Sequence, residues 1–316
     1  MTRVMILGLP NRDSRGFWNV AQVHSVSDMT TSSLPDLSPR LPVTWWCLLI
    51  RAIVGIALML VANFARIPLH SWAENRFAGD DTALVNASSV IFLLTPALII
   101  AGVAVWMRVV ERASIRVTGL LNPRGAGVGL LGGLAIVSVA MAAAWLVLAF
   151  VAPPLSDAPA ETVAVGGTDL TQVGIGWVLL YLVVRALLLQ GLPEELIFRG
   201  WFFHVTRTRP WLTLAWTTVA FTAIHLTSSG GQQSTLDFLI YLMIPLGMSI
   251  LGGALMLWTG NVWWAAGAHG GVHIGLAVGS VVYPIALGPV AWTVIGLAQI
   301  LLGVIILAWW NARRRR

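Results

Sequence analysis

The sequence predicts an all-α, polytopic membrane protein with about eight transmembrane helices in one bundle. Two observations carry this prediction. Of the 316 residues, 57% are apolar and only 10% are charged, whereas a soluble domain carries about 25% charged residues. Eight apolar segments are also each close to the roughly 20 residues that span a bilayer. They lie near residues 44–65, 87–107, 126–152, 174–206, 211–228, 237–258, 261–281 and 289–310.

The chain divides into a polar tail, a helical bundle and a short basic tail. Residues 1–43 are rich in Ser, Pro and Asp and lack the continuous apolar region and cleavage site of a signal peptide. We therefore expect a mostly disordered cytoplasmic tail there. Residues 44–310 should form the transmembrane bundle, and residues 311–316 a basic cytoplasmic tail.

The distribution of arginine predicts the orientation of this bundle. All 19 basic residues are arginine. With a cytoplasmic N-terminus, the arginine-rich segments fall on the inside, and the outside segments hold only Arg66 and Arg76. The positive-inside rule therefore predicts two cytoplasmic termini. The net charge of +6 is spread over loop ends, so we expect contact with membrane lipids and no binding of nucleic acid.

Two adjacent glutamates interrupt the apolar segment 174–206. Ionised side chains at membrane depth cost several kcal/mol unless they are paired or line a wet cavity, so Glu194 and Glu195 predict a functional site. Arg199 follows Glu195 by four residues and can pair with it along a helix. The segment is too long for one perpendicular span, so it must tilt, break near Gly191-Leu192-Pro193, or extend beyond the membrane. Pro193 disfavours a helical Leu192, and a kink there would lie just before the two glutamates.

Three histidines lie in other apolar segments. His269 and His273 are four residues apart and share one helix face. Glu194 and His225 lie about 20 Å from the inner ends of their segments, provided that the glutamate helix continues to Arg207. We therefore expect the two glutamates and the three histidines to converge.

Such a cluster supports two kinds of chemistry. A glutamate can take a proton from water while histidines donate to a developing oxyanion. Alternatively, Glu194, His225, His269 and His273 could supply the nitrogen and oxygen ligands of a tetrahedral Zn²⁺ site. Both lead to attack of water on a carbonyl and thus to hydrolysis of a peptide bond. The structural alternatives are a glutamate pair at a helix end, a snorkelling arginine and a hydrogen-bonding histidine. Arg51 and Arg185 fit such structural roles.

Three motifs in order resemble the CPBP family of CAAX prenyl proteases and bacteriocin-processing or bacteriocin-immunity (Abi) proteins. Glu-Glu-x-x-x-Arg is matched from Glu194 to Arg199, and Phe-x-x-x-His by Phe221 and His225. His-x-x-x-Asn/Asp is matched at His269, but the chain has His273 where the family has Asn or Asp. The resemblance covers roughly residues 170–285.

The resemblance implies an intramembrane endopeptidase of a bacterial cytoplasmic membrane, acting on a peptide or protein that is prenylated or bacteriocin-like. By it, Glu194 activates the attacking water with help from His225. His269 and the residue at 273 stabilise the oxyanion, and Glu195 and Arg199 orient the site. The mechanism that we favour requires no cofactor. Because His is a better Zn²⁺ ligand than Asn, the histidine at position 273 keeps the zinc mechanism open.

Two other functions stay open at this point. A membrane immunity or scaffold protein of the same family would bind a partner without cleaving it. A proton-coupled transporter would use Glu194 and the histidines as a relay. The chain shows no internal repeat of the kind that many transporters have, which disfavours the transporter.

Overall fold

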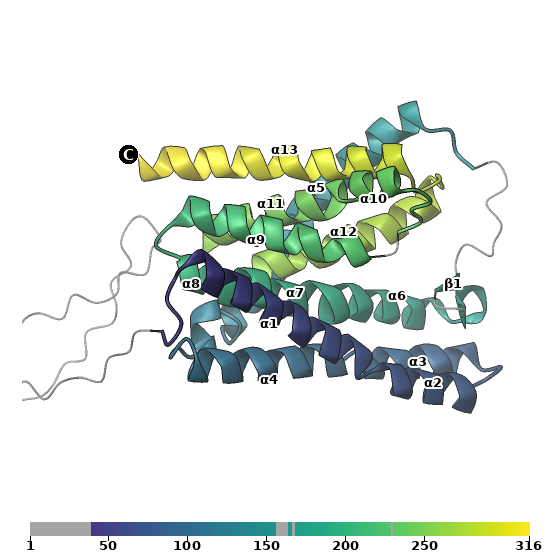
Figure 1. Ribbon diagram of the computed structural model, residues 1–316. Helices are drawn as coiled ribbons and strands as arrows, with labels where there is room; N and C mark the ends of the chain where they lie inside the picture. The colour runs from purple at the N-terminus through teal and green to yellow at the C-terminus, as the bar shows by residue number, and fades with distance from the viewer. Residues whose placement is uncertain (1–38, 156–163, 166–167, 229) are drawn as a thin grey trace, which may run out of the picture. The chain divides into compact units, whose positions relative to one another are not determined.

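The computed structural model describes residues 39–316 except residues 156–163, 166–167 and 229 (Figure 1). Most of the predicted N-terminal tail therefore lies outside the described residues. The helices are α1 (Trp45–Phe64), α2 (Ile67–Arg76), α3 (Asp81–Ile91), α4 (Leu94–Val109), η1 (Ile115–Thr118), α5 (Pro123–Val151), η3 (Leu170–Gln172), α6 (Ile175–Val183), η4 (Val184–Gly191), α7 (Leu192–Glu195), η5 (Leu196–Trp201), α8 (Phe202–Thr206), α9 (Pro210–Ile224), η6 (His225–Thr227), α10 (Thr235–Tyr241), α11 (Met243–Thr259), α12 (Val262–Val282) and α13 (Pro289–Arg314). Strands β1 (Ala164–Val165) and β2 (Thr168–Asp169) pair antiparallel.

The predicted fold class, an all-α polytopic membrane protein, is confirmed. In the part of the chain that the structure describes, seven helical segments are long and apolar enough to cross a membrane. The predicted number of eight is one higher, because the segment predicted at 211–228 contains α9, which has only 15 residues. At 1.5 Å per residue α9 is about 22 Å long, short of the roughly 30 Å hydrocarbon core. The cytoplasmic location of the termini stays a prediction.

One helix runs without a break through the glutamate segment, from Ile175 to Thr206. Of the alternatives for this long segment, a break near Pro193 is excluded, since Leu192 before it has helical angles of φ −66° and ψ −47°. The physical reason is the local winding: the π-helical turns of η4 precede α7, and Pro193 occupies the first turn of α7, where a missing N–H costs least. The helix therefore extends far enough to place Glu194 in the middle of the span.

Glycines allow α12 to approach the glutamate helix closely. A Cβ atom on Gly191 would lie 2.9 Å from the carbonyl oxygen of Ala266 and 3.1 Å from the amide nitrogen of Gly270. On its other side α12 meets α5, where a Cβ on Gly133 would collide with the backbone of Trp264. Small residues at helix contacts let backbones pack together inside a membrane. This packing holds α12, which carries His269 and His273, against η4 and α7.

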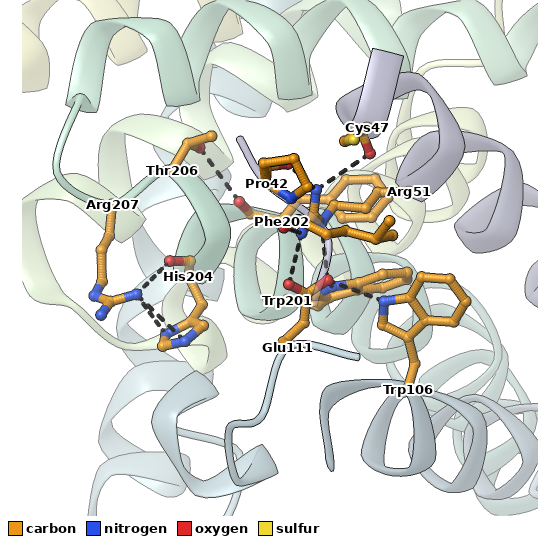
Figure 2. A network of polar contacts seen from close by, with 11 residues as sticks. Pro42, Cys47, Arg51, Trp106, Glu111, Trp201, Phe202, His204, Thr206 and Arg207 are labelled. Atoms are coloured by element: carbon orange, nitrogen blue, oxygen red, sulfur yellow. Dashed lines mark hydrogen bonds and ion pairs between the residues drawn. The ribbon is translucent and has the colours of Figure 1, made fainter. Parts of the chain in front are cut away.

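Arg51 in α1 forms a buried ion pair with Glu111, which follows α4 (Figure 2). Its Nε and Nη2 atoms each donate to a different oxygen of Glu111 at 2.8 Å. The remaining hydrogen bonds of the guanidinium go to the backbone carbonyls of Leu41, Pro42 and Cys47 at 2.8, 3.1 and 3.3 Å. The five guanidinium hydrogens thus match five bonds, so the structural role expected for Arg51 agrees with its contacts.

The same carboxylate accepts two indole N–H groups, and we call the resulting set of contacts the Glu111 network. Trp106 and Trp201 donate to its Oε1 atom at 3.0 and 3.1 Å, and Figure 2 shows both rings beside Glu111. Burial raises the pKa of Glu111, but the hydrogen bonds from Arg51, Trp106 and Trp201 outweigh burial and leave the pKa below its ordinary value. The network joins α1, the end of α4 and η5 at one level of the bundle.

We predict that Glu111→Gln lowers the free energy of unfolding by about 3–5 kcal/mol, because it leaves the buried Arg51 guanidinium without a counter-charge. Thermal unfolding of the purified protein in detergent measures the change.

The pH dependence provides the control for this prediction. Because the pKa of Glu111 is depressed in the folded state, its stabilisation is complete above the ordinary pKa of 4.5 and is lost as the pH falls through the folded-state value. The variant should therefore lose less stability than the wild type on acidification from neutral pH to below 4.5. Equal losses in the two proteins would contradict the assignment.

Candidate active site

Glu195 is completely buried and holds two helices together through one oxygen atom. Its Oε1 atom accepts a hydrogen bond of 3.1 Å from Nη1 of Arg199 on η5. The same atom lies 3.0 Å from Nδ1 of His269 on α12. Because an ionised carboxylate only accepts, Nδ1 of His269 carries the proton of that bond. Glu195 therefore fixes the position of the His269 ring.

Arg199 is also completely buried, and it connects Glu195 to two further helices. Its Nη2 atom donates to the carbonyl oxygen of Ser249 at 3.0 Å and to the Ser249 hydroxyl at 2.8 Å. The guanidinium carbon lies 4.5 Å from the centre of the Phe221 ring in α9, a cation–π distance. The Ser249 hydroxyl in turn donates to Thr218 at 3.1 Å. Sequence analysis missed Ser249, although a serine within the apolar segment 237–258 was a visible signal.

Glu194 occupies a different environment from its neighbour. Its side chain keeps 17% of its surface exposed, and its Oε2 atom has no hydrogen-bond partner in the described part of the chain. That atom lies 3.9 Å from Nε2 of His225 and 4.0 Å from Nε2 of His269. Both distances are too long for a direct hydrogen bond and are of the kind that one bridging water spans.

His225 is oriented by the last turn of α9. Its Nδ1 atom lies 2.8 Å from the carbonyl oxygen of Phe221. Because a carbonyl oxygen only accepts, Nδ1 carries the proton, and in the neutral ring Nε2 is left with a free lone pair facing Glu194. The Phe-x-x-x-His spacing is what allows this bond within one helical turn.

His273 lies beside His269 rather than against a glutamate. The two rings stack with their centres 5.3 Å apart and their planes at 30°. Of the residues predicted for the site, the structure thus brings Glu194, His225 and His269 together directly. Glu195 and Arg199 support this group, and His273 reaches it through the His269 ring.

The zinc ligands predicted from the sequence are Glu194, His225, His269 and His273. Over residues 39–316, apart from the gaps in the described chain, no three or more His, Cys, Asp or Glu side chains are arranged to hold a metal ion. Glu194, His225 and His269 are nevertheless donors of the kinds that zinc takes, so the zinc site stays a prediction.

The comparison with protein families agrees with the motifs. Residues 176–275 match the family model described as type II CAAX prenyl endopeptidase Rce1-like. The match supports the assignment of this segment to the CPBP family. It contains all three motifs and every residue predicted for the site, and together with the apolar helices it identifies an integral, multi-pass membrane protein of a protease family. No curated protein and no solved structure matches the chain.

We predict that Ser249→Ala destabilises the protein by about 1.5–3 kcal/mol, because the buried Arg199 loses a hydrogen bond to a charged group. Thermal unfolding in detergent is the measurement. Ser249→Thr keeps the hydroxyl and should stay close to the wild type. Ser138→Ala is the matched control, since Ser138 is an exposed serine of α5 that bonds only within its own helix. Equal effects of Ser249→Ala and Ser138→Ala would show that Arg199 does not depend on this bond.

Proposed function

We propose that the protein is an intramembrane endopeptidase that hydrolyses a peptide bond of a membrane-associated peptide or protein with water activated by Glu194 and His225. One observation supports this proposal above all. The Oε2 atom of Glu194 has no bond of its own and faces the Nε2 atoms of two histidines at 3.9 and 4.0 Å. A carboxylate placed in this way is suited to act as a general base.

In the proposed reaction the attacking water binds between Glu194 and His225. Glu194 accepts a proton from the water, and the water oxygen forms a bond to the carbonyl carbon of the substrate. The surrounding residues are buried, so the local dielectric constant is low. The attraction between the Glu194 carboxylate and the water proton is therefore stronger than it would be in bulk water. The His225 lone pair at Nε2 holds the second hydrogen of the water in place.

The oxyanion that forms is stabilised by His269. Glu195 accepts from Nδ1 of His269 and stabilises a positive charge on the ring, so that Nε2 can donate to the oxyanion. Arg199 pairs with Glu195 at 3.1 Å and holds it in place. His273, stacked on His269, is the additional donor that the family resemblance implies. When the intermediate collapses, Glu194 returns its proton to the leaving amine, and the peptide bond breaks.

We predict that Glu194→Gln and His225→Ala each lower the rate of proteolysis by about 10²–10⁴-fold, the usual contribution of a general acid or base. The purified protein is incubated with a solubilised bacterial membrane fraction in water enriched in ¹⁸O. Mass spectrometry then counts peptides whose new carboxyl terminus carries the label.

The control for this measurement is His204→Ala. His204 belongs to the same continuous helix as Glu194 but contacts Arg207 instead of the site, and Figure 2 shows the two side chains together. This variant should cleave at the wild-type rate. Formation of labelled peptides at the wild-type rate by both Glu194→Gln and His225→Ala would overturn the proposal. A non-catalytic immunity or scaffold function would then be favoured.

A separate prediction concerns metal. Because the mechanism that we propose uses Glu194 and His225 without a cofactor, we expect an active preparation to contain far less than one zinc per chain and to keep its activity in a chelator. Elemental analysis measures the zinc content. About one equivalent that is lost in His273→Ala, together with the activity, would favour the zinc mechanism instead.

A further inference from the structure

A second cluster of polar side chains lies away from Glu194, where α2 meets α6 and η4. We call Arg66, His70, Tyr181 and Arg185 the basic cluster. The rings of His70 and Tyr181 lie 5.3 and 5.4 Å from the centre of the Phe92 ring, and the Arg66 guanidinium carbon lies 5.8 Å from it. Arg185 lies one helical turn after Tyr181 on the same helix, near enough for its charge to act on both Arg66 and Tyr181.

The positive charges of this cluster have no carboxylate bound to them. Among the described residues, neither Arg66 nor Arg185 forms an ion pair, in contrast to Arg51 and Arg199. Glu74 acts on His70 from the next turn of α2, but it makes no ion pair with the cluster. The Nε atom of Arg66 and the Nε2 atom of His70 are buried without a hydrogen-bond partner. Buried donors without partners cost free energy, so the cluster is suited to an anion.

The depth of the cluster follows from the Glu111 network. Arg51 and Trp201 bind the same carboxylate and therefore lie at one level. Arg66 lies 15 residues from Arg51 along α1, and Arg185 lies 16 residues from Trp201 along the glutamate helix. The two arginines are thus separated from that level by similar lengths of chain, and the contacts of Arg66 and Tyr181 with the Phe92 ring bring the two helices together there. In Figure 1 both helices run from the α8 end toward the β1 end.

This depth coincides with the edge of the hydrocarbon core. The helix α1 has 20 residues, hence a length of about 30 Å, which equals the thickness of that core. Arg66 follows α1 directly and thus lies at the level of the lipid headgroups. Its neighbours Phe64, Ile67 and Leu69 expose 61%, 50% and 43% of their surfaces, as side chains in contact with acyl chains do.

We propose that the basic cluster binds the phosphate of a phospholipid headgroup. Two guanidinium groups offer forked donors that match phosphate oxygens, and the Tyr181 hydroxyl adds a donor. An anion shared by Arg66 and Arg185 removes the repulsion between them and supplies partners for the buried Arg66 Nε and His70 Nε2 atoms. Free phosphate has the same chemistry, but the headgroup depth and the exposed apolar neighbours favour a lipid.

The test is thermal unfolding of the full chain in detergent with added phosphatidylglycerol. At about 100-fold excess over the dissociation constant, the lipid should raise the Tm of the wild type by about 5 °C. Arg66→Gln/Arg185→Gln should abolish the rise, and Arg66→Lys/Arg185→Lys should keep most of it. Arg76→Gln is the matched control, since Arg76 is an exposed arginine at the other end of α2, and it should respond as the wild type does.

Two further ligands identify the group that is bound. Diacylglycerol with the same acyl chains lacks the phosphate and should give no shift, and inorganic phosphate lacks the chains and should give little. Should the double glutamine variant not fold, native mass spectrometry of Arg66→Gln alone replaces it, and one phosphatidylglycerol retained by the wild type should be missing from the variant. An equal shift with diacylglycerol, an equal shift with inorganic phosphate, or retention of the lipid by the glutamine variants would each overturn the proposal.

Discussion

The arrangement of the candidate site depends on one buried carboxylate. Glu195 is fully enclosed within a transmembrane helix, where an ionised group is stable only with partners. Arg199 supplies the counter-charge and His269 a hydrogen bond, while Ser249 and the Phe221 ring hold Arg199 in turn. These contacts join η5, α9, α11 and α12. Removing Arg199 would leave Glu195 without its counter-charge, and removing any other contact would leave a buried charged group with fewer partners, so separating these helices is costly.

This constraint also explains why the two adjacent glutamates differ. Consecutive residues on an α-helix point about 100° apart. Glu195 therefore faces α11 and α12 and binds Arg199 and His269 through its Oε1 atom, whereas Glu194 is partly exposed and faces His225. The Oε2 atoms of both carboxylates have no partner among the described residues. Two identical side chains next to each other in sequence thus obtain separate roles from their directions alone. Glu195 thus stabilises the packing of the helices, and Glu194 stays available to react.

The parts of this arrangement that depend on local spacing could be predicted from the sequence. Four-residue spacings placed Arg199 beside Glu195 and His273 beside His269, and apolar length gave seven of the spans. Pairings between distant helices could not be predicted, since nothing local connects Arg51 with Glu111. The sequence left open whether the long segment breaks near Pro193, because π-helical winding depends on packing around the helix, which a propensity for proline does not include. Arg66 drew attention only as a charge for orientation.

Charged side chains lie on or beside the continuous helix from α6 to α8 at three levels. At each level the charge is compensated in a different way. At Trp201 the carboxylate of Glu111 has a full set of partners, which is suited to stability alone. At Glu194 and Glu195 one carboxylate is paired and the other is free. At Arg185 the described chain supplies no counter-charge at all. An unpaired charge at membrane depth costs several kcal/mol unless water or a ligand compensates it. Water and a peptide carbonyl would meet this requirement at Glu194, and an anion would meet it at Arg185.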